Sequence, residues 1–285
     1  MKPSSPFFSK IMNTIHIGWH SKQIRIGFIF TCIALFFALL GPYFSPYAYT
    51  DLVGYAYGKP DAKAWLGYDV LGRDVWSRLL SGGQSIVWMS IVASFLALAI
   101  GSALGLAAAY IRNKTDQTIM WATDVFIAFP DLILVLLIVS LLGRDHWIIV
   151  VTVAIAFAPG VIRLSRGIAL SVTTQEFIEA AEMMGYSRVQ ILFREILPNI
   201  LTPLLIHFGI MLTWAVGMLS GLAFLGYGVA PPAADWGLMI NENRAGLLIQ
   251  PIAVFAPVLF IAIFALGTNL LAEGVSRVTA RIEER

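Results

Sequence analysis

The sequence predicts an all-α membrane protein with six transmembrane helices. Of its 285 residues, 58% are hydrophobic and 13% are charged, whereas soluble domains carry about 25% charged residues. The mean hydropathy of +0.79 points to lipid as the solvent. A helix that crosses a bilayer needs roughly 20 mostly apolar residues. Six segments meet this requirement: 26–44, 86–111, 120–142, 147–164, 200–224 and 251–272.

The charge and cysteine content exclude some classes of function. The net charge is only +2, and no basic run is interleaved with aromatic residues, so no nucleic-acid partner is predicted. The one cysteine, Cys32, lies in the first apolar segment, which rules out an intramolecular disulfide. We expect it to be a buried structural thiol.

The first apolar segment, 26–44, is predicted to be an uncleaved transmembrane helix that follows a cytoplasmic segment, 1–25. Lys22 and Arg25 precede it, as basic residues precede a signal peptide. The apolar run is nevertheless longer than the roughly 7–15 residues of a signal-peptide core, and no small-x-small cleavage pattern follows.

Lys and Arg residues beside the spans predict the orientation, because cytoplasmic flanks carry an excess of them. With the N-terminus inside, 13 of the 19 Lys and Arg residues lie in the cytoplasm and six outside: Lys59, Lys63, Arg73, Arg78, Arg144 and Arg244. Both termini are therefore predicted to be cytoplasmic, with 275–285 as the tail. Residues 45–85 and 226–250 form two outer segments.

The first outer segment contains the sequence LGYDVLGRDVWSRLL at 66–80. Its apolar and charged residues predict an amphipathic helix at the membrane surface, which Gly82 and Gly83 end before the second span. We expect Arg73 and Asp74 to hold this segment in place near an outer gate.

The spans carry three further signals. Gly101 and Gly105 in the second span form a small-x-x-x-small face that suits close helix packing. Met211 and Trp214 in the fifth span favour the bundle core, with a path lining as the alternative. In the third, Asp124 and Asp131 are seven residues apart and are expected to project from one side.

Carboxylates inside a membrane are candidates for function. For both aspartates a structural role is favoured: helix pairing for Asp124, and capping of backbone freed by Pro130 for Asp131. A path lining and a proton relay are the alternatives.

The loop before the fifth span, 176–198, is charged and helical in pattern. Glu176, Glu179 and Glu182 share one helix face and have no opposite charge at i+3 or i+4. Phe177, Ala181 and Met184 are expected to form the apolar face. Gly185 is predicted to end this helix in a left-handed conformation, and Pro198 to close a second amphipathic run. The loop is either a solvated connector or a docking element for a basic partner.

Glu179, Ala180, Ala181, Gly185 and Pro198 resemble the EAA loop of ABC importer permeases, and only Glu195 departs, where that pattern has isoleucine. Three further stretches resemble the shorter permease of peptide and nickel importers: 66–80, 124–136 and 222–240. Gln84 and Asp235 are departures, because that family usually has arginine and glutamate there. The resemblance covers about 65–274 and implies a type I importer core, five helices at 86–274 with an added N-terminal helix.

The resemblance also implies partners. These are a second homologous permease, two ATP-binding subunits that dock at the EAA loops, and an extracytoplasmic substrate-binding protein. The protein is expected in the bacterial inner membrane, with ATP hydrolysis on its partner and with no catalytic residue, metal or cofactor of its own.

Di- or oligopeptides are the favoured substrate class, with nickel chelates, glutathione and metallophores as alternatives. A proton-coupled secondary transporter that uses Asp124 and Asp131 is the alternative from another class, but it leaves the cytoplasmic loop unexplained.

Overall fold

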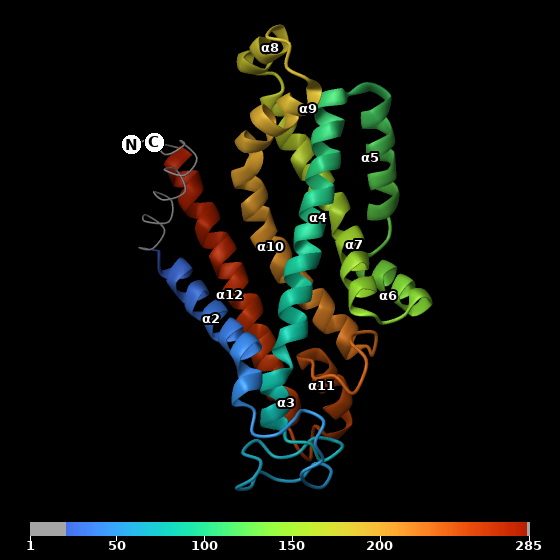
Figure 1. Ribbon diagram of the computed structural model, residues 1–285, viewed down its shortest axis with the longest axis vertical. Helices are drawn as coiled ribbons and strands as arrows, with labels where there is room; N and C mark the ends of the chain where they lie inside the picture. The colour runs from blue at the N-terminus through green and yellow to red at the C-terminus, as the bar shows by residue number, and fades with distance from the viewer. Residues whose placement is uncertain (1–20, 284–285) are drawn as a thin grey trace. The chain divides into compact units, whose positions relative to one another are not determined.

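The computed structural model describes residues 21–283, and this part of the chain is almost entirely helical (Figure 1). Residues 1–20 of the predicted N-terminal segment and the last two residues of the tail lie outside it. The helices are α2 (Lys22–Leu40), α3 (Val75–Ser81), α4 (Gly83–Ile111), α5 (Asn113–Ile127), α6 (Asp131–Leu142), α7 (His146–Val172), α8 (Glu176–Met183), α9 (Arg188–Gln190), α10 (Leu197–Phe224), α11 (Trp236–Asn243) and α12 (Ile252–Glu283), with short turns η1 (Gly41–Phe44), η2 (Ile191–Ile196) and η3 (Arg244–Gly246).

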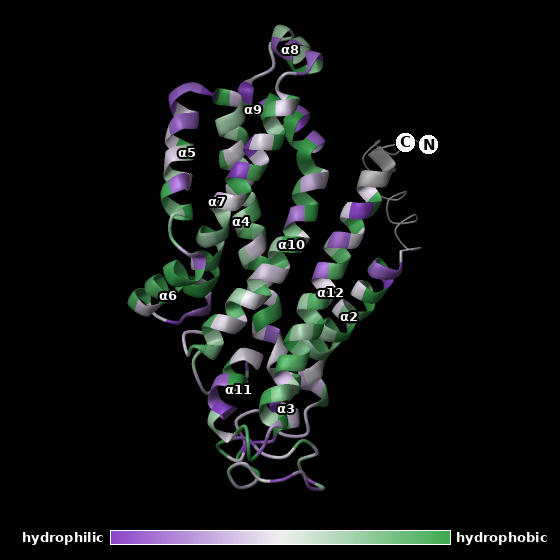
Figure 2. Ribbon diagram, turned by 180° about the vertical axis from the view of Figure 1, so that it is seen from behind, coloured by the Kyte–Doolittle hydropathy of each residue, from purple (hydrophilic) through white to green (hydrophobic). Residues whose placement is uncertain are grey.

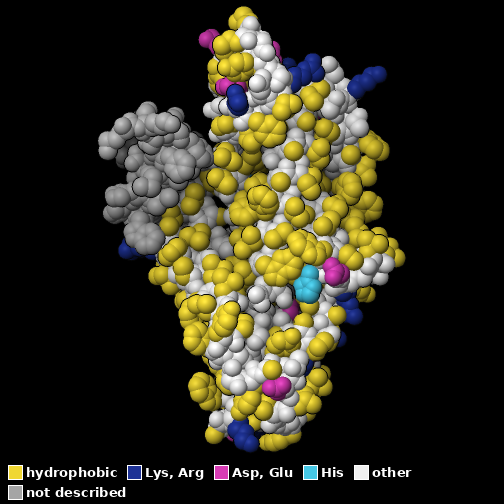
Figure 3. Space-filling model, viewed as in Figure 1, with side chains coloured by type: hydrophobic (Ala, Val, Ile, Leu, Met, Phe, Trp, Pro, Cys, Tyr) yellow, Lys and Arg dark blue, Asp and Glu magenta, His cyan; other side chains and the backbone are white. Residues whose placement is uncertain are grey.

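The fold class predicted from the sequence is confirmed. Five helices of the described chain are long and apolar enough to cross a membrane, and α5 with α6 makes a sixth if this bent pair counts as one span. Hydropathy colouring shows the long helices mostly apolar (Figure 2), and hydrophobic side chains cover much of the face seen in Figure 3. Such a surface fits a lipid environment.

The chain forms two compact units, residues 1–90 with 212–285 and residues 91–211. In the first unit α2 packs along α12. A Cβ atom added to Gly27 would lie only 2.8 Å from the backbone nitrogen of Leu271, so glycine permits this close approach. Cys32 is exposed on α2, and the expectation of a buried thiol is wrong.

In the second unit α4 packs closely on α7, as the two glycines predict. A Cβ atom on Gly101 would overlap the side chain of Val161, and one on Gly105 would overlap Ser165. The Ser165 hydroxyl lies 2.7 Å from the Val161 carbonyl oxygen and 3.1 Å from that of Gly101. The small face therefore brings the two helix backbones together, as small residues do inside membranes.

The third span is broken, although the apolar run at 120–142 predicts a single helix. The axes of α5 and α6 meet at 85°. Pro130 precedes α6 in an extended conformation with ψ of 126°, and proline disfavours helical backbone in the residue before it. Asp124 is therefore in α5 and Asp131 begins α6, so the prediction that both project from one side of a single span is wrong.

Candidate docking loop and outer ion-pair network

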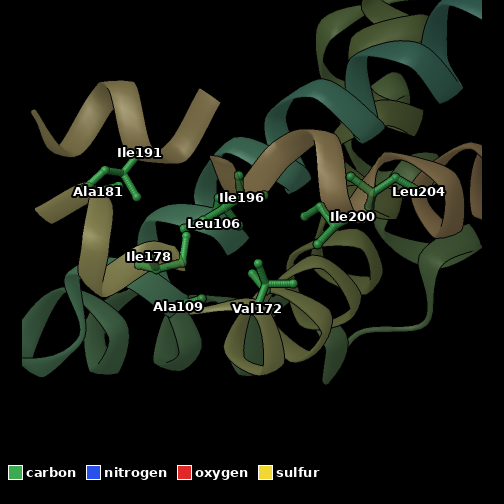
Figure 4. Close-up of a cluster of buried hydrophobic side chains, with 10 residues drawn as sticks. Leu106, Ala109, Val172, Ile178, Ala181, Ile191, Ile196, Ile200 and Leu204 are labelled. Carbon is green, nitrogen blue, oxygen red and sulfur yellow. The ribbon is translucent and has the colours of Figure 1, made fainter. Parts of the chain in front are cut away.

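The candidate docking loop, residues 176–198, lies in the second unit and is anchored by a different face from the one predicted. Ile178 and Ala181 are buried, whereas Phe177 and Met184 are 37% and 65% exposed. Of the predicted apolar face, only Ala181 is buried, because the helix turns its Ile178 side inward and leaves Phe177 and Met184 exposed. Figure 4 shows the apolar cluster that receives it. Its buried members are Leu106, Ala109, Ala169, Val172, Ile178, Ala181, Ile191, Ile196, Ile200 and Leu204.

Gly185 ends α8 in the left-handed conformation that its position predicts. Its φ angle is +80°. The backbone N–H of Gly185 donates to the Glu182 carbonyl at 3.0 Å, and that of Tyr186 donates to the Ala181 carbonyl at 3.2 Å. This pair of bonds is a Schellman motif, which satisfies carbonyl groups at the end of a helix and turns the chain sharply.

The second half of the loop runs directly into α10. Ser187 caps α9 through a reciprocal pair of hydrogen bonds with Gln190. A π-helical turn, η2, follows and joins α10, so 188–224 is one helical segment. Pro198 therefore does not close the run as predicted. It lies just after the π turn, and a missing N–H donor there bends a helix without ending it.

The exposed surface of the loop combines carboxylates with apolar side chains (Figure 3). Glu176 and Glu179 are exposed, and neither carboxylate takes part in a hydrogen bond or ion pair within residues 21–283. The exposed apolar residues include Met183, Met184, Tyr186, Val189 and Phe193. Exposed apolar side chains that gather on one part of a surface mark candidate protein-interaction sites. This bent segment is therefore a candidate docking element.

Two ion pairs join α5 to α7 in the same unit. The Asp124 carboxylate lies 2.6 Å from the Arg163 guanidinium, with both side chains about half exposed, and Asp116 binds Arg166 through two hydrogen bonds of 2.6 and 2.7 Å. Asp124 thus has a partner on a neighbouring helix, which agrees with the structural role favoured for it.

The outer ion-pair network, which consists of Asp69, Arg73, Arg78 and Glu242, lies in the first unit. Arg73 bridges Asp69 at 2.6 Å and Glu242 at 2.8 Å, and Arg78 also contacts both carboxylates, Asp69 at 2.8 Å. Arg78 and Asp69 are fully buried, and Arg73 is 3% exposed. Two cations and two anions compensate each other here, as buried charges require.

The network binds residues 45–85, the first predicted outer segment, to residues 226–250, the second. Beside it, the backbone N–H of Val70 donates to Asn243 at 2.9 Å, and the indole N–H of Trp236 donates to the Leu79 carbonyl at 2.8 Å. The Gln250 amide donates to the carbonyl groups of Gly58 and Leu66. Residues 58–82 and 236–250 are therefore held as one body.

Asp74 has a different role from Arg73. Its carboxylate caps α3 by accepting from the backbone N–H and the hydroxyl of Ser77, at 2.9 and 2.6 Å. The helix begins only at Val75, so the first part of the 66–80 segment that the sequence predicts to be an amphipathic helix is not helical. In the segment before α3, the Asp61 carboxylate accepts two backbone N–H bonds, which lower its pKa. Burial raises the pKa of Tyr68 in the same segment to about 12.

Comparison with known proteins places the chain in a family. Residues 101–281 match the model of the binding-protein-dependent transport system inner membrane component. The chain belongs to this family. It is 34% identical to the glutathione transport system permease protein GsiD of Pectobacterium atrosepticum, covering 87% of the chain and 83% of the relative. It is 35% identical to GsiD of Escherichia coli, with 87% and 82% covered.

A solved structure has a similar fold. The inward-facing methionine ABC transporter MetNI contains a chain that matches with a TM-score of 0.54 and 20% identity, covering 70% of this chain and 96% of that one. Family membership makes the protein a multi-pass membrane permease subunit of an ABC importer, and the solved structure agrees with the fold.

The structure separates the remaining candidate residues of the permease. Met211 is 4% exposed and packs with Ala97, Ala154 and Val161, whereas Trp214 is 70% exposed on α10. The expected position in the core of the bundle is therefore confirmed for Met211 and wrong for Trp214. Asp131 is exposed in the first turn of α6, where the helix dipole favours a carboxylate. In the described part of the chain, no side-chain hydrogen bond caps the start of this helix, so the expected capping role of Asp131 is wrong. None of these placements tests a path or gate role, which stays a prediction.

Sequence reasoning missed the two carboxylates of the outer network, Asp69 and Glu242. Asp69 is four residues before Arg73, a spacing that offered a weak signal. Glu242 is 169 residues from Arg73, so no local pattern links them. It also missed that Asp235, the departure from the family pattern, caps α11 by accepting from the Leu238 N–H at 3.0 Å.

Proposed function

We propose that this permease forms half of the translocation path of an ATP-driven importer and that its 176–198 loop is the docking site of a partner ATP-binding subunit. One observation carries the proposal: the loop is fixed to the helix cluster on its Ile178 side and presents unpaired carboxylates and apolar side chains on its other side. ATP hydrolysis then belongs to the partner. Because η2 continues into α10, a displacement of the loop moves a spanning helix.

A charge reversal in the loop tests this proposal. Glu179→Lys is expected to abolish co-purification of the ATP-binding subunit or to reduce it at least tenfold, since a lost charge contact at an interface costs about 2–5 kcal/mol. The folded permease should be unaffected, because Glu179 is exposed and its side chain makes no ion pair within residues 21–283.

The matched control is Gln117→Lys, which adds a cation to an exposed position of α5 outside the loop and should co-purify normally. Full ATPase binding, stimulated hydrolysis and uptake by Glu179→Lys would show that the acidic face is only solvated.

The full assembly in this proposal has four further components: a second homologous permease, two ATP-binding subunits and an extracytoplasmic binding protein. Both termini lie in the cytoplasm, since this orientation leaves 13 of 19 Lys and Arg residues inside. It also places the docking loop on the side where ATP is available. The outer body of residues 58–82 and 236–250 is then on the side where substrate is delivered.

Short peptides are the proposed substrates. The resemblance to peptide permeases supports the class, and the two GsiD relatives are named for glutathione, itself a tripeptide. In vesicles with the whole transporter, labelled glutathione or a labelled dipeptide should accumulate only with ATP, and unlabelled short peptides should compete. ATP-dependent uptake of nickel chelates or metallophores with no peptide competition would instead favour those alternatives, and uptake driven by a proton gradient alone would overturn the ATP-driven assignment.

A further inference from the structure

One hydrogen bond connects the docking loop to the end of a spanning helix. The Tyr110 hydroxyl donates to Glu182 Oε1 at 2.7 Å. Tyr110 is the penultimate residue of α4, and Glu182 lies in the last turn of α8. Within residues 21–283 it is the one side-chain hydrogen bond that joins α8 to another helix. Glu182, predicted from the sequence to lack a partner in the loop, therefore has one in α4.

The surroundings make this contact directional. Ile178 and Ala181 belong to the same buried cluster as Leu106 and Ala109 of α4 (Figure 4), and the Tyr110 ring packs on this cluster. Apolar contacts are non-directional and allow a short helix to slide or rotate. A hydrogen bond to a carboxylate is short, directional and stronger than one between neutral groups. The Tyr110–Glu182 bond thus fixes the rotation of α8 about its own axis relative to the end of α4.

We propose that Tyr110 is a positioning residue for transport: through Glu182 it makes α4 follow the movement of the docking loop. The inference rests on the proposed function, because it requires an ATP-binding subunit that displaces α8. The loop would then act on two spanning helices, on α10 through the continuous backbone and on α4 through this hydrogen bond. Both contacts belong to the second unit.

The test separates coupling from docking. Tyr110→Phe removes only the hydroxyl and keeps the packed ring. We expect the purified transporter to retain its ATP-binding subunits at the normal ratio and to hydrolyse ATP, while peptide uptake per ATP hydrolysed falls about tenfold, the effect of one hydrogen bond to a charged group. Tyr43→Phe, which removes the hydroxyl of an 84% exposed tyrosine in η1, is the control and should not change this ratio.

Variants of Glu182 complete the experiment. Glu182→Gln keeps an oxygen acceptor and should retain most of the peptide uptake per ATP hydrolysed. Glu182→Leu removes the acceptor and should lower this ratio as much as Tyr110→Phe does. The double variant Tyr110→Phe/Glu182→Leu should be no worse than either single change, because both remove the same interaction.

The outcomes are distinguishable. Unchanged uptake per ATP in Tyr110→Phe, or additive losses in the double variant, overturns the inference. Loss of ATP-binding subunits from Tyr110→Phe also overturns it, since the tyrosine would then only support the docking surface. Failure of the proposed function itself would appear earlier, as a wild-type permease that binds no ATP-binding subunit.

Discussion

Replacing Arg78 with methionine is expected to destabilise the outer body of the permease by about 3–5 kcal/mol, the cost of leaving buried charge without its partner. Arg78 is fully buried and contacts Asp69, Glu242 and the carbonyl oxygen of Ala233. Without it, two carboxylates share the single cation of Arg73. The expected result is a lower thermal midpoint of the purified transporter and faster proteolysis within residues 45–81.

Two further variants make the result specific. Lys63→Met removes an exposed cation from the same segment and should leave stability within about 0.5 kcal/mol of wild type. The double variant Arg78→Met/Glu242→Met removes one charge of each sign and keeps the Arg73–Asp69 pair. It should recover most of the loss, because no uncompensated charge remains buried. If Arg78→Met is as stable as Lys63→Met, the network does not hold the outer segments together.

The network shows where sequence reasoning ends. Hydropathy predicts the spanning helices because each needs a long apolar run of its own. Gly101 and Gly105 predict a close helix contact because small residues on one helix face let two backbones approach each other. No local pattern predicts Glu242, the carboxylate that both Arg73 and Arg78 contact. Glu242 is 169 residues from Arg73, and only the folded chain brings them together. The amphipathic pattern around them therefore suggested a surface helix, where the structure has buried ion pairs.

The two prolines show a second limit. Proline tends to break helices, but Pro130 and Pro198 differ in the structure. Pro130 lies at the break between α5 and α6, whereas Pro198 lies within a continuous helical segment. The difference is the π turn before Pro198, which tertiary packing of Ile191 and Ile196 supports. The buried side of α8 is also set by packing, because Ile178 and Phe177 are both apolar and only Ile178 joins the cluster formed with α4, α7, η2 and α10.

Gly185→Val is expected to uncouple ATP hydrolysis from transport without preventing membrane insertion. The φ angle of +80° is accessible to glycine, but a β-branched residue there costs about 1–3 kcal/mol. A Cβ atom at this position would meet nothing within 4 Å, so the penalty comes from the backbone alone. The Schellman bonds of Gly185 and Tyr186 would be lost, and α9 would leave α8 at a different angle.

The direct comparison is Gly185→Asn, because asparagine tolerates the left-handed region and should keep most activity. Gly167→Val makes the same side-chain change at a helical glycine that also has open space around it, and should be nearly neutral. The measurement is substrate-stimulated ATP hydrolysis and uptake by the reconstituted transporter, with the amount of permease in the membrane as the reference. The three variants add side chains of similar size but differ in how well the new residue tolerates the backbone conformation at its position. Equal activity in Gly185→Val and Gly185→Asn would therefore mean that the sharp turn after α8 is not needed for coupling.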